Sequence, residues 1–176
     1  PEAVRIANAW FDNLGQCKAR QQRILIGDAR LKIEQQPPSQ IYDIIILDAF
    51  TGHSVPIHLL TREAFATYAR HLKPKGFISV HITNSYLNLY PVVKAQALQL
   101  GFGYRSKFQP SDKERNVLRN QHFVMTRDES YLQQYPSVLR YWTNSDGQVI
   151  RTENPDWPGV RLWTDQFSTI QAIEWP

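Results

Sequence analysis

Polar residues follow three apolar runs of the chain, and they are the candidates for chemistry. They lie within the segments Gly27-Asp28-Ala29-Arg30, Asp48-Ala49-Phe50-Thr51-Gly52-His53 and His81-Ile82-Thr83-Asn84. In open α/β sheets, ligands bind at the carboxyl ends of the strands. If the three runs are strands, these segments line a binding edge.

Asp48 is the strongest candidate, because it directly follows four consecutive aliphatic residues. A charge at the mouth of a buried strand keeps solvent or a ligand as its partner, since burying it unpaired is costly. Partial desolvation raises the pKa of a carboxyl group toward the working pH, which suits a general base, and the carboxylate can equally hold a cationic group. The structural alternative is a salt bridge to a neighbouring Arg or Lys.

Asp28 lies where a strand is expected to become a helix. The simplest role is an N-cap, in which the carboxylate accepts a hydrogen bond from a backbone N–H. The functional alternative is a carboxylate that accepts a hydrogen bond from the exocyclic amine of a nucleobase. One side chain can fill both roles.

Histidine and serine do not have the spacing of known catalytic motifs. His53 and His58 are not separated by the four positions of a helical zinc pair, and no Glu accompanies them as in a metalloprotease. With His81 as the remaining candidate ligand, we expect no metal site. Ser54 and Ser79 are in no Gly-x-Ser-x-Gly motif, which argues against a serine hydrolase.

Composition indicates one globular domain in a reducing compartment. The chain has 176 residues, of which 42% are hydrophobic, and 20 basic against 16 acidic residues give a net charge of +4. The basic residues are scattered, so we expect no nucleic-acid partner. Cys17 is the single cysteine, which excludes an internal disulfide. The longest apolar run, 44–47, is far shorter than the roughly 20 residues of a membrane helix, so we expect a cytoplasmic domain.

The hydrophobic pattern predicts alternating helices and strands. Continuous apolar runs predict strands covered on both faces, whereas helical spacing with a stop at glycine predicts helices. The expected order is helix 2–14, strand 23–27, strand 42–48, a helix capped by Thr61 and ended by 73–76, strand 77–83, a helix opened by Tyr90-Pro91 and ended by Gly101, a charged loop or hairpin tip at 112–120, and strand 121–126. This alternation predicts a doubly wound α/β layer sandwich.

The chain is expected to divide near residue 127. Residues 1–127 carry the alternating pattern, whereas 128–176 is rich in Tyr and Trp interrupted by Asn-Pro and Trp-Pro. We interpret 128–176 as an aromatic capping tail of the same domain. Because Pro1 opens directly into a helical pattern, we also expect the chain to be cut from a longer polypeptide.

Several motifs in this order resemble the spermidine synthase family of aminopropyltransferases. They are ILIGDAR, YDIIILDAF, HLLTREAF, LKPKGF and HITN, and the likeness is greatest to the bacterial type fused to transporter-like segments. The resemblance implies a methyltransferase-type Rossmann sheet that binds decarboxylated S-adenosylmethionine, with no metal. It implies that Gly27, Asp28, Ala29 and Pro56 lie on the adenine side, and that Asp48 is the catalytic carboxylate that takes a proton from the acceptor amine.

The sequence departs from the family pattern in two regions. The family's second aspartate, which helps to hold the polyamine, is replaced by Thr51 in the substrate-binding loop, and the loop 49–56 is one residue longer. The glycine-rich turn and the acidic ribose-binding residue would precede this sequence. We therefore expect a sheet without its first two strands, completed by the rest of the polypeptide or by a second copy in a homo-oligomer.

Three functions remain open at this point. The first is aminopropyl transfer from decarboxylated S-adenosylmethionine to a polyamine or another small-molecule amine. The second is methyl transfer from S-adenosylmethionine. The third is a catalytically inactive nucleotide-binding or regulatory domain of a membrane-attached protein. For the fragment alone, we expect little or no activity.

Overall fold

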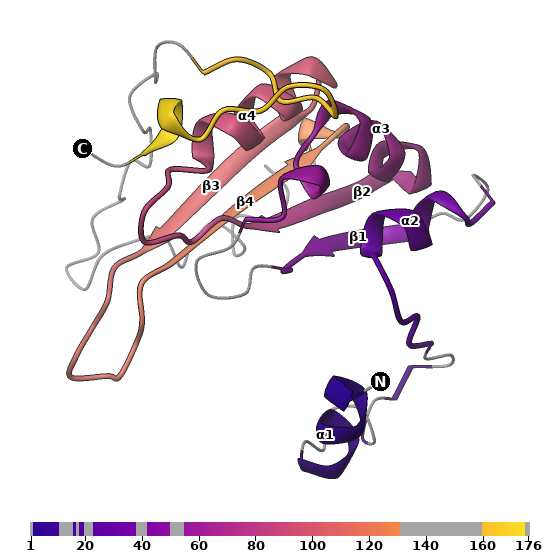
Figure 1. Ribbon diagram of the computed structural model, residues 1–176, viewed down its shortest axis with the longest axis vertical. Helices are drawn as coiled ribbons and strands as arrows, with labels where there is room; N and C mark the ends of the chain where they lie inside the picture. The colour runs from indigo at the N-terminus through magenta and orange to yellow at the C-terminus, as the bar shows by residue number, and fades with distance from the viewer. Residues whose placement is uncertain are drawn as a thin grey trace. The chain divides into compact units, whose positions relative to one another are not determined.

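The computed structural model describes residues 2–10, 16, 18–19, 23–37, 42–49, 55–130 and 160–174. It forms two compact units, residues 1–35 and 36–176, which are described separately (Figure 1). The expected division near residue 127 stays a prediction. No helix among the described residues is long and apolar enough to cross a membrane.

The first unit contains two short helices, α1 (Glu2–Trp10) and α2 (Ala29–Glu34). The predicted helix 2–14 is present as far as Trp10, and residues 11–15 lie outside the described residues. The predicted strand at 23–27 is wrong, because residues 23–26 are not assigned to a strand and Ile24, Leu25 and Ile26 are about half exposed. A strand needs a hydrogen-bonding neighbour, and no strand is found in the described part of this unit.

The second unit is built on a mixed four-stranded sheet in the order β1-β2-β4-β3. The strands are β1 (Tyr42–Leu47), β2 (Leu72–His81), β3 (Gly103–Gln109) and β4 (Asn120–Thr126). β1 and β2 pair in parallel, whereas β4 is antiparallel to both of its neighbours. β3 therefore runs in the same direction as β1 and β2, so that β4 is the reversed strand of the four (Figure 1).

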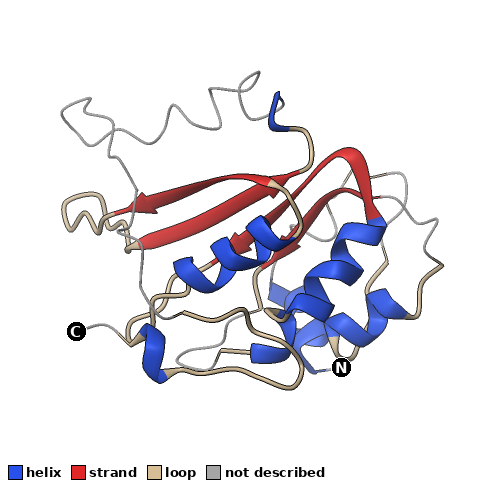
Figure 2. Ribbon diagram, turned by 90° about the horizontal axis from the view of Figure 1, so that it is seen from above, coloured by secondary structure: helices blue, strands red, loops and turns tan. Residues whose placement is uncertain are grey.

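Helices connect the parallel strands, and the two α-helices among them are ones that the sequence predicts. The 3₁₀ helix η1 (Ile57–Leu59) and helix α3 (Arg62–His71) lie between β1 and β2, and α4 (Tyr90–Gln99) lies between β2 and β3. The Thr61 hydroxyl caps α3 by accepting from the Ala64 N–H at 3.3 Å, and Pro91 occupies the first turn of α4. Both helices pack against the sheet (Figures 1 and 2).

The core lies between this helix layer and one face of the sheet. Alternate strand residues point into it, because successive side chains of a strand point to opposite faces. Fully or nearly fully buried apolar residues of the sheet and helices are Ile45, Ile78, Val80, Phe123, Met125, Phe65, Val93 and Ala97. The Phe123 ring packs between Tyr90 and Tyr104, with ring centroids 5.6 and 5.2 Å away.

The segment 72–76 ends α3 and begins β2. The sequence predicts that 73–76 ends the helix, and α3 does end at His71, but β2 starts at the next residue. The register with β1 shifts here, because Tyr42 pairs with Leu72 whereas Ile44 pairs with Phe77. A Cβ atom at Gly76 would lie 2.8 Å from the Asp43 carbonyl oxygen, so the irregular pairing requires glycine at this position.

Residues 160–174 pack onto the helices of the same unit and include the 3₁₀ helix η2 (Gln171–Ile173). The Trp163 side chain is completely buried, and its carbonyl oxygen accepts hydrogen bonds from the Arg62 N–H at 2.8 Å and from the Gln96 side-chain amide at 3.0 Å. The Thr61 hydroxyl also donates to the Asp165 carboxylate at 2.7 Å. This segment therefore fixes the start of α3 to the middle of α4.

Candidate functional site

Asp48 and His81 meet at the carboxyl edge of the sheet. Asp48 comes directly after β1, and His81 is the last residue of β2. Because Leu47 pairs with Val80 in the parallel register, the next residue of each strand is brought side by side. His81 Nδ1 lies 2.8 Å from Asp48 Oδ1, and the two side chains are 24% and 62% exposed. Asp48 is thus held by a neighbour yet open to a ligand.

The other imidazole nitrogen determines which way this hydrogen bond runs. His81 Nε2 lies 2.7 Å from the Thr83 hydroxyl oxygen, which in turn accepts from the Gln121 N–H at 2.6 Å. A second possible acceptor for the Thr83 hydroxyl, the Gln121 carbonyl oxygen, is farther away at 3.4 Å. The shorter distance favours Thr83 O–H donating to Nε2, which leaves the proton of a neutral imidazole on Nδ1. His81 therefore donates to Asp48 and orients its carboxylate.

Two further side chains continue this arrangement across the sheet. His81 pairs with His122 on β4, and His122 pairs with Lys107 on β3. The two imidazole rings are stacked with centroids 4.9 Å apart. Asp48, His81, His122 and Lys107 thus form a row with one member from each strand or strand end, which we call the transverse row.

The environment of His122 disfavours its protonated form. Burial is the main cause that lowers the pKa of His122; the neighbouring His81 and Lys107 lower it further, whereas the Asp48 carboxylate raises it. Burial also lowers the pKa of Lys107. The middle of the transverse row is therefore partly desolvated, so that charges there interact more strongly than they would in water.

An open groove of about 480 Å³ adjoins the transverse row. Its described lining residues are Lys107, Gln109, Val117, Leu118, Asn120 and His122, so it lies over the paired strands β3 and β4 and beside the loop that joins them. A smaller pocket of about 140 Å³ is lined by Ile82, Thr83, Asn84, Phe108, Arg119 and Gln121. Both hollows lie at the edge of the sheet where Thr83 and His122 are found.

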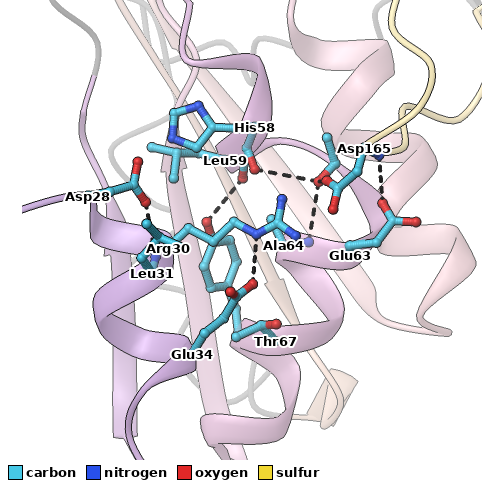
Figure 3. Close-up of polar contacts among 12 residues, drawn as sticks. Asp28, Arg30, Leu31, Glu34, His58, Leu59, Glu63, Ala64, Thr67 and Asp165 are labelled. Atoms are coloured by element: carbon cyan, nitrogen blue, oxygen red, sulfur yellow. Dashed lines mark hydrogen bonds and ion pairs between the residues drawn. The ribbon is translucent and has the colours of Figure 1, made fainter.

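Asp28 fills the structural role that we considered for it. Its carboxylate accepts a hydrogen bond from the Leu31 N–H at 3.0 Å and caps α2 (Figure 3). Gly27 precedes it with a positive φ of 135°, and Ala29 is the first residue of the helix. Arg30 pairs with Glu34 at 2.8 Å. The adenine contacts predicted for Gly27, Asp28 and Ala29 stay predictions.

The remaining predicted residues are at the start of η1 or beyond the described residues. Pro56 is the N-cap residue of η1, and His58 lies within this short helix. Thr51 and His53 lie outside the described residues. Among the described residues, the ion-pair partner of Asp48 is His81 rather than an Arg or Lys, because the parallel register brings the ends of β1 and β2 together.

Sequence reasoning missed the roles of His81, His122 and Lys107. His81 was weighed as a metal ligand, and among the described residues no group of three or more His, Cys, Asp or Glu side chains could hold a metal ion. His122 and Lys107 were not singled out. The available signal was alternation, since both occupy the outward-facing positions of their strands, but their pairing depends on a register that only the fold defines.

Comparison with known proteins gives a curated relative for most of the chain. No protein-family model matches the chain. The sequence is 30% identical over 170 residues to a polyamine aminopropyltransferase of Vibrio vulnificus (strain CMCP6), with 86% of this chain and 53% of that protein covered. The chain thus spans about half the length of the curated relative that it matches.

Solved structures show the same fold at low sequence identity. A probable spermidine synthase from Corynebacterium glutamicum ATCC 13032 has a TM-score of 0.56 and 23% identity, covering 72% of this chain and 44% of that one. The spermidine synthase from Thermotoga maritima has a TM-score of 0.54 and 12% identity, covering 94% and 51%. Human methyltransferase-like protein 13, in complex with SAH, has a TM-score of 0.52 and 18% identity, covering 80% and 66%. These likenesses confirm the predicted methyltransferase-type Rossmann-like fold.

Proposed function

The chain is spermidine synthase-like in sequence and fold, and from this premise we propose that the sheet edge at Asp48 is the acceptor side of an aminopropyltransferase active site. The observation that carries the proposal is the 2.8 Å hydrogen bond between His81 Nδ1 and Asp48 Oδ1 at the adjoining ends of β1 and β2. Ligands of open α/β sheets bind at this edge. The donor substrate would be decarboxylated S-adenosylmethionine.

The reaction is a nucleophilic substitution at carbon. The neutral nitrogen of the acceptor amine attacks the aminopropyl carbon bonded to the sulfonium, a C–N bond forms, and the C–S bond breaks to release methylthioadenosine. The nitrogen carries a positive charge after attack and loses a proton. Asp48 is placed to accept that proton, and its carboxylate also attracts and orients the amine before attack.

His81 serves as a positioning residue in this scheme. Its Nδ1–H holds Asp48 Oδ1, which directs the other carboxylate oxygen toward the acceptor. The Thr83 hydroxyl and the Gln121 N–H fix the imidazole in the tautomer that can do so. The proton from the amine therefore goes to Asp48, while His81 keeps its own proton and stabilises the carboxylate before transfer.

Asp48→Asn is the direct test, made in the complete natural polypeptide that carries this sequence. Turnover of putrescine with decarboxylated S-adenosylmethionine should fall by about 10²- to 10⁴-fold, the usual contribution of a general base. Asp43→Asn is the matched control, because Asp43 is also on β1 but is exposed and pairs with Lys73 at 2.8 Å, away from the edge. Unchanged turnover in Asp48→Asn would remove this residue from the role.

Calorimetry separates this function from the other two. Methylthioadenosine, S-adenosylmethionine and its decarboxylated form are titrated separately, each with and without putrescine. Aminopropyl transfer requires that the decarboxylated form binds. It also requires that addition of putrescine either tightens this binding or starts turnover. Binding and turnover of S-adenosylmethionine alone would favour a methyltransferase. Absence of binding by all three would leave a domain without either activity.

A further inference from the structure

The transverse row has opposite charges at its two ends. Asp48 lies at the β1 end and Lys107 on β3, with the two stacked imidazoles of His81 and His122 between them. Neighbouring strands are about 4.8 Å apart, so three spacings separate the backbones of Asp48 and Lys107 by about 14 Å. A molecule lying along the row therefore meets a negative charge at one end and a positive charge at the other.

The groove at the Lys107 end is suited to an anion. Among its six described lining residues, none carries a carboxylate, whereas Lys107 is a cation and Gln109 and Asn120 carry side-chain amides. Val117 and Leu118 supply an apolar wall that a methylene chain can contact. The Lys107 ammonium and the apolar wall together favour a chain that ends in a carboxylate.

The same groove disfavours the second ammonium group of a diamine. Once Asp48 holds one amine, the other end of a long diamine would approach the Lys107 ammonium group, where like charges repel. Lys107 is partly buried, so solvent screens this repulsion less than it would at a fully exposed lysine.

We propose that the acceptor of this enzyme is an amine whose far end carries a carboxylate, with the amine at Asp48 and the carboxylate in the groove at Lys107. The inference rests on the aminopropyl transfer proposed above and specifies its acceptor class. The chemistry is unchanged: the new C–N bond forms at the amine, methylthioadenosine leaves, and the carboxylate serves only for binding.

Matched acceptors of equal length test the proposal. In the complete natural polypeptide, kcat/KM is measured with decarboxylated S-adenosylmethionine for putrescine against 4-aminobutanoate and for 1,8-diaminooctane against 8-aminooctanoate. We expect 8-aminooctanoate to be preferred over its diamine by about tenfold or more, which corresponds to about 1.4 kcal/mol. The short pair should discriminate less, because four carbons do not reach from Asp48 to the groove.

Charge reversal at Lys107 should invert this preference. Lys107→Glu is expected to favour 1,8-diaminooctane, and Lys107→Gln should remove the discrimination while keeping the fold, which thermal unfolding checks. Lys113→Glu is the control, since Lys113 lies in the same β3–β4 hairpin but is not among the residues that line the groove. A diamine preference in the unaltered protein, or discrimination that is the same in all three variants, would overturn the proposal.

The outcomes distinguish this proposal from the function on which it rests. Turnover of diamines alone would reject the carboxylate acceptor and keep the aminopropyltransferase. If no amine is turned over, calorimetry with methylthioadenosine already bound still compares 8-aminooctanoate with 1,8-diaminooctane. Failure of the amino acid to bind more tightly than the diamine in that experiment would reject the acceptor class directly.

Discussion

The two faces of the four-stranded sheet are made by alternate residues of the same strands, yet one face is apolar and buried whereas the other carries polar and charged side chains. On the helix-covered face, Ile78, Val80, Phe123 and Met125 are completely buried. On the other face, the same strands present the transverse row. Residues one position apart therefore serve either packing or chemistry, and the two uses can be altered separately.

Phe123→Ala should have the largest effect on stability. Phe123 is completely buried between two tyrosine rings, and removing a buried Phe side chain usually costs about 3–5 kcal/mol. Urea unfolding measures the change. The neighbouring Val124→Ala lies on the other face and is half-buried, so it should cost clearly less. Equal losses in both variants would contradict the contrast between the faces.

Thr61→Ala should have an intermediate effect, again on the packed side. The Thr61 hydroxyl caps α3 and donates to Asp165, and loss of an N-cap side chain costs about 1–2 kcal/mol. Glu63 adds to this end of the helix by accepting from the Asp165 N–H at 2.9 Å (Figure 3). Thr61→Ser keeps both hydrogen bonds and should unfold at nearly the same urea concentration as the unaltered protein. A loss as large as that of Thr61→Ala would assign the effect to the methyl group instead.

The smallest effect concerns the pH dependence of stability, and it arises on the polar face. Burial lowers the pKa of His122 in the folded protein, so the unfolded chain binds this proton more readily. The stability contributed by neutral His122 is therefore complete above the ordinary histidine pKa and is lost as the pH falls below it. In His122→Gln, the unfolding temperature should decline less between about pH 7 and pH 5. An unchanged pH profile would show that protonation of His122 is not what destabilises the fold.

Local patterns in the sequence were sufficient to predict most of the second unit. The isoleucine run before Asp48, the Thr61 cap and the Tyr90-Pro91 start each predict an element that the structure contains. β3 was not predicted, because the sequence GYRSKFQ has no aliphatic residue and most of its polar side chains line the outer face. The run at 23–27 was predicted as a strand on hydrophobicity alone, which does not supply a pairing partner.

The candidate site was predictable at Asp48 but not in its surroundings. A carboxylate after a buried strand is visible in the sequence, whereas its contact with His81 depends on which strands are neighbours and in which register. His122 joins the row by pairing with His81, which is 41 residues away in the sequence, and Lys107 joins it by pairing with His122, which is 15 residues away. Such contacts are set by the whole sheet rather than by any local spacing.

The reversed direction of β4 has a consequence for how such a protein can diversify. Because β3 and β4 form a hairpin, their connecting loop, 110–119, emerges at the same edge as the ends of β1 and β2. Substitutions or insertions in that loop reshape the wall of the groove without disturbing Asp48, His81 or the buried layer. If the groove selects the acceptor as proposed, this hairpin is the part of the fold in which the preference can change while Asp48 and His81 are kept.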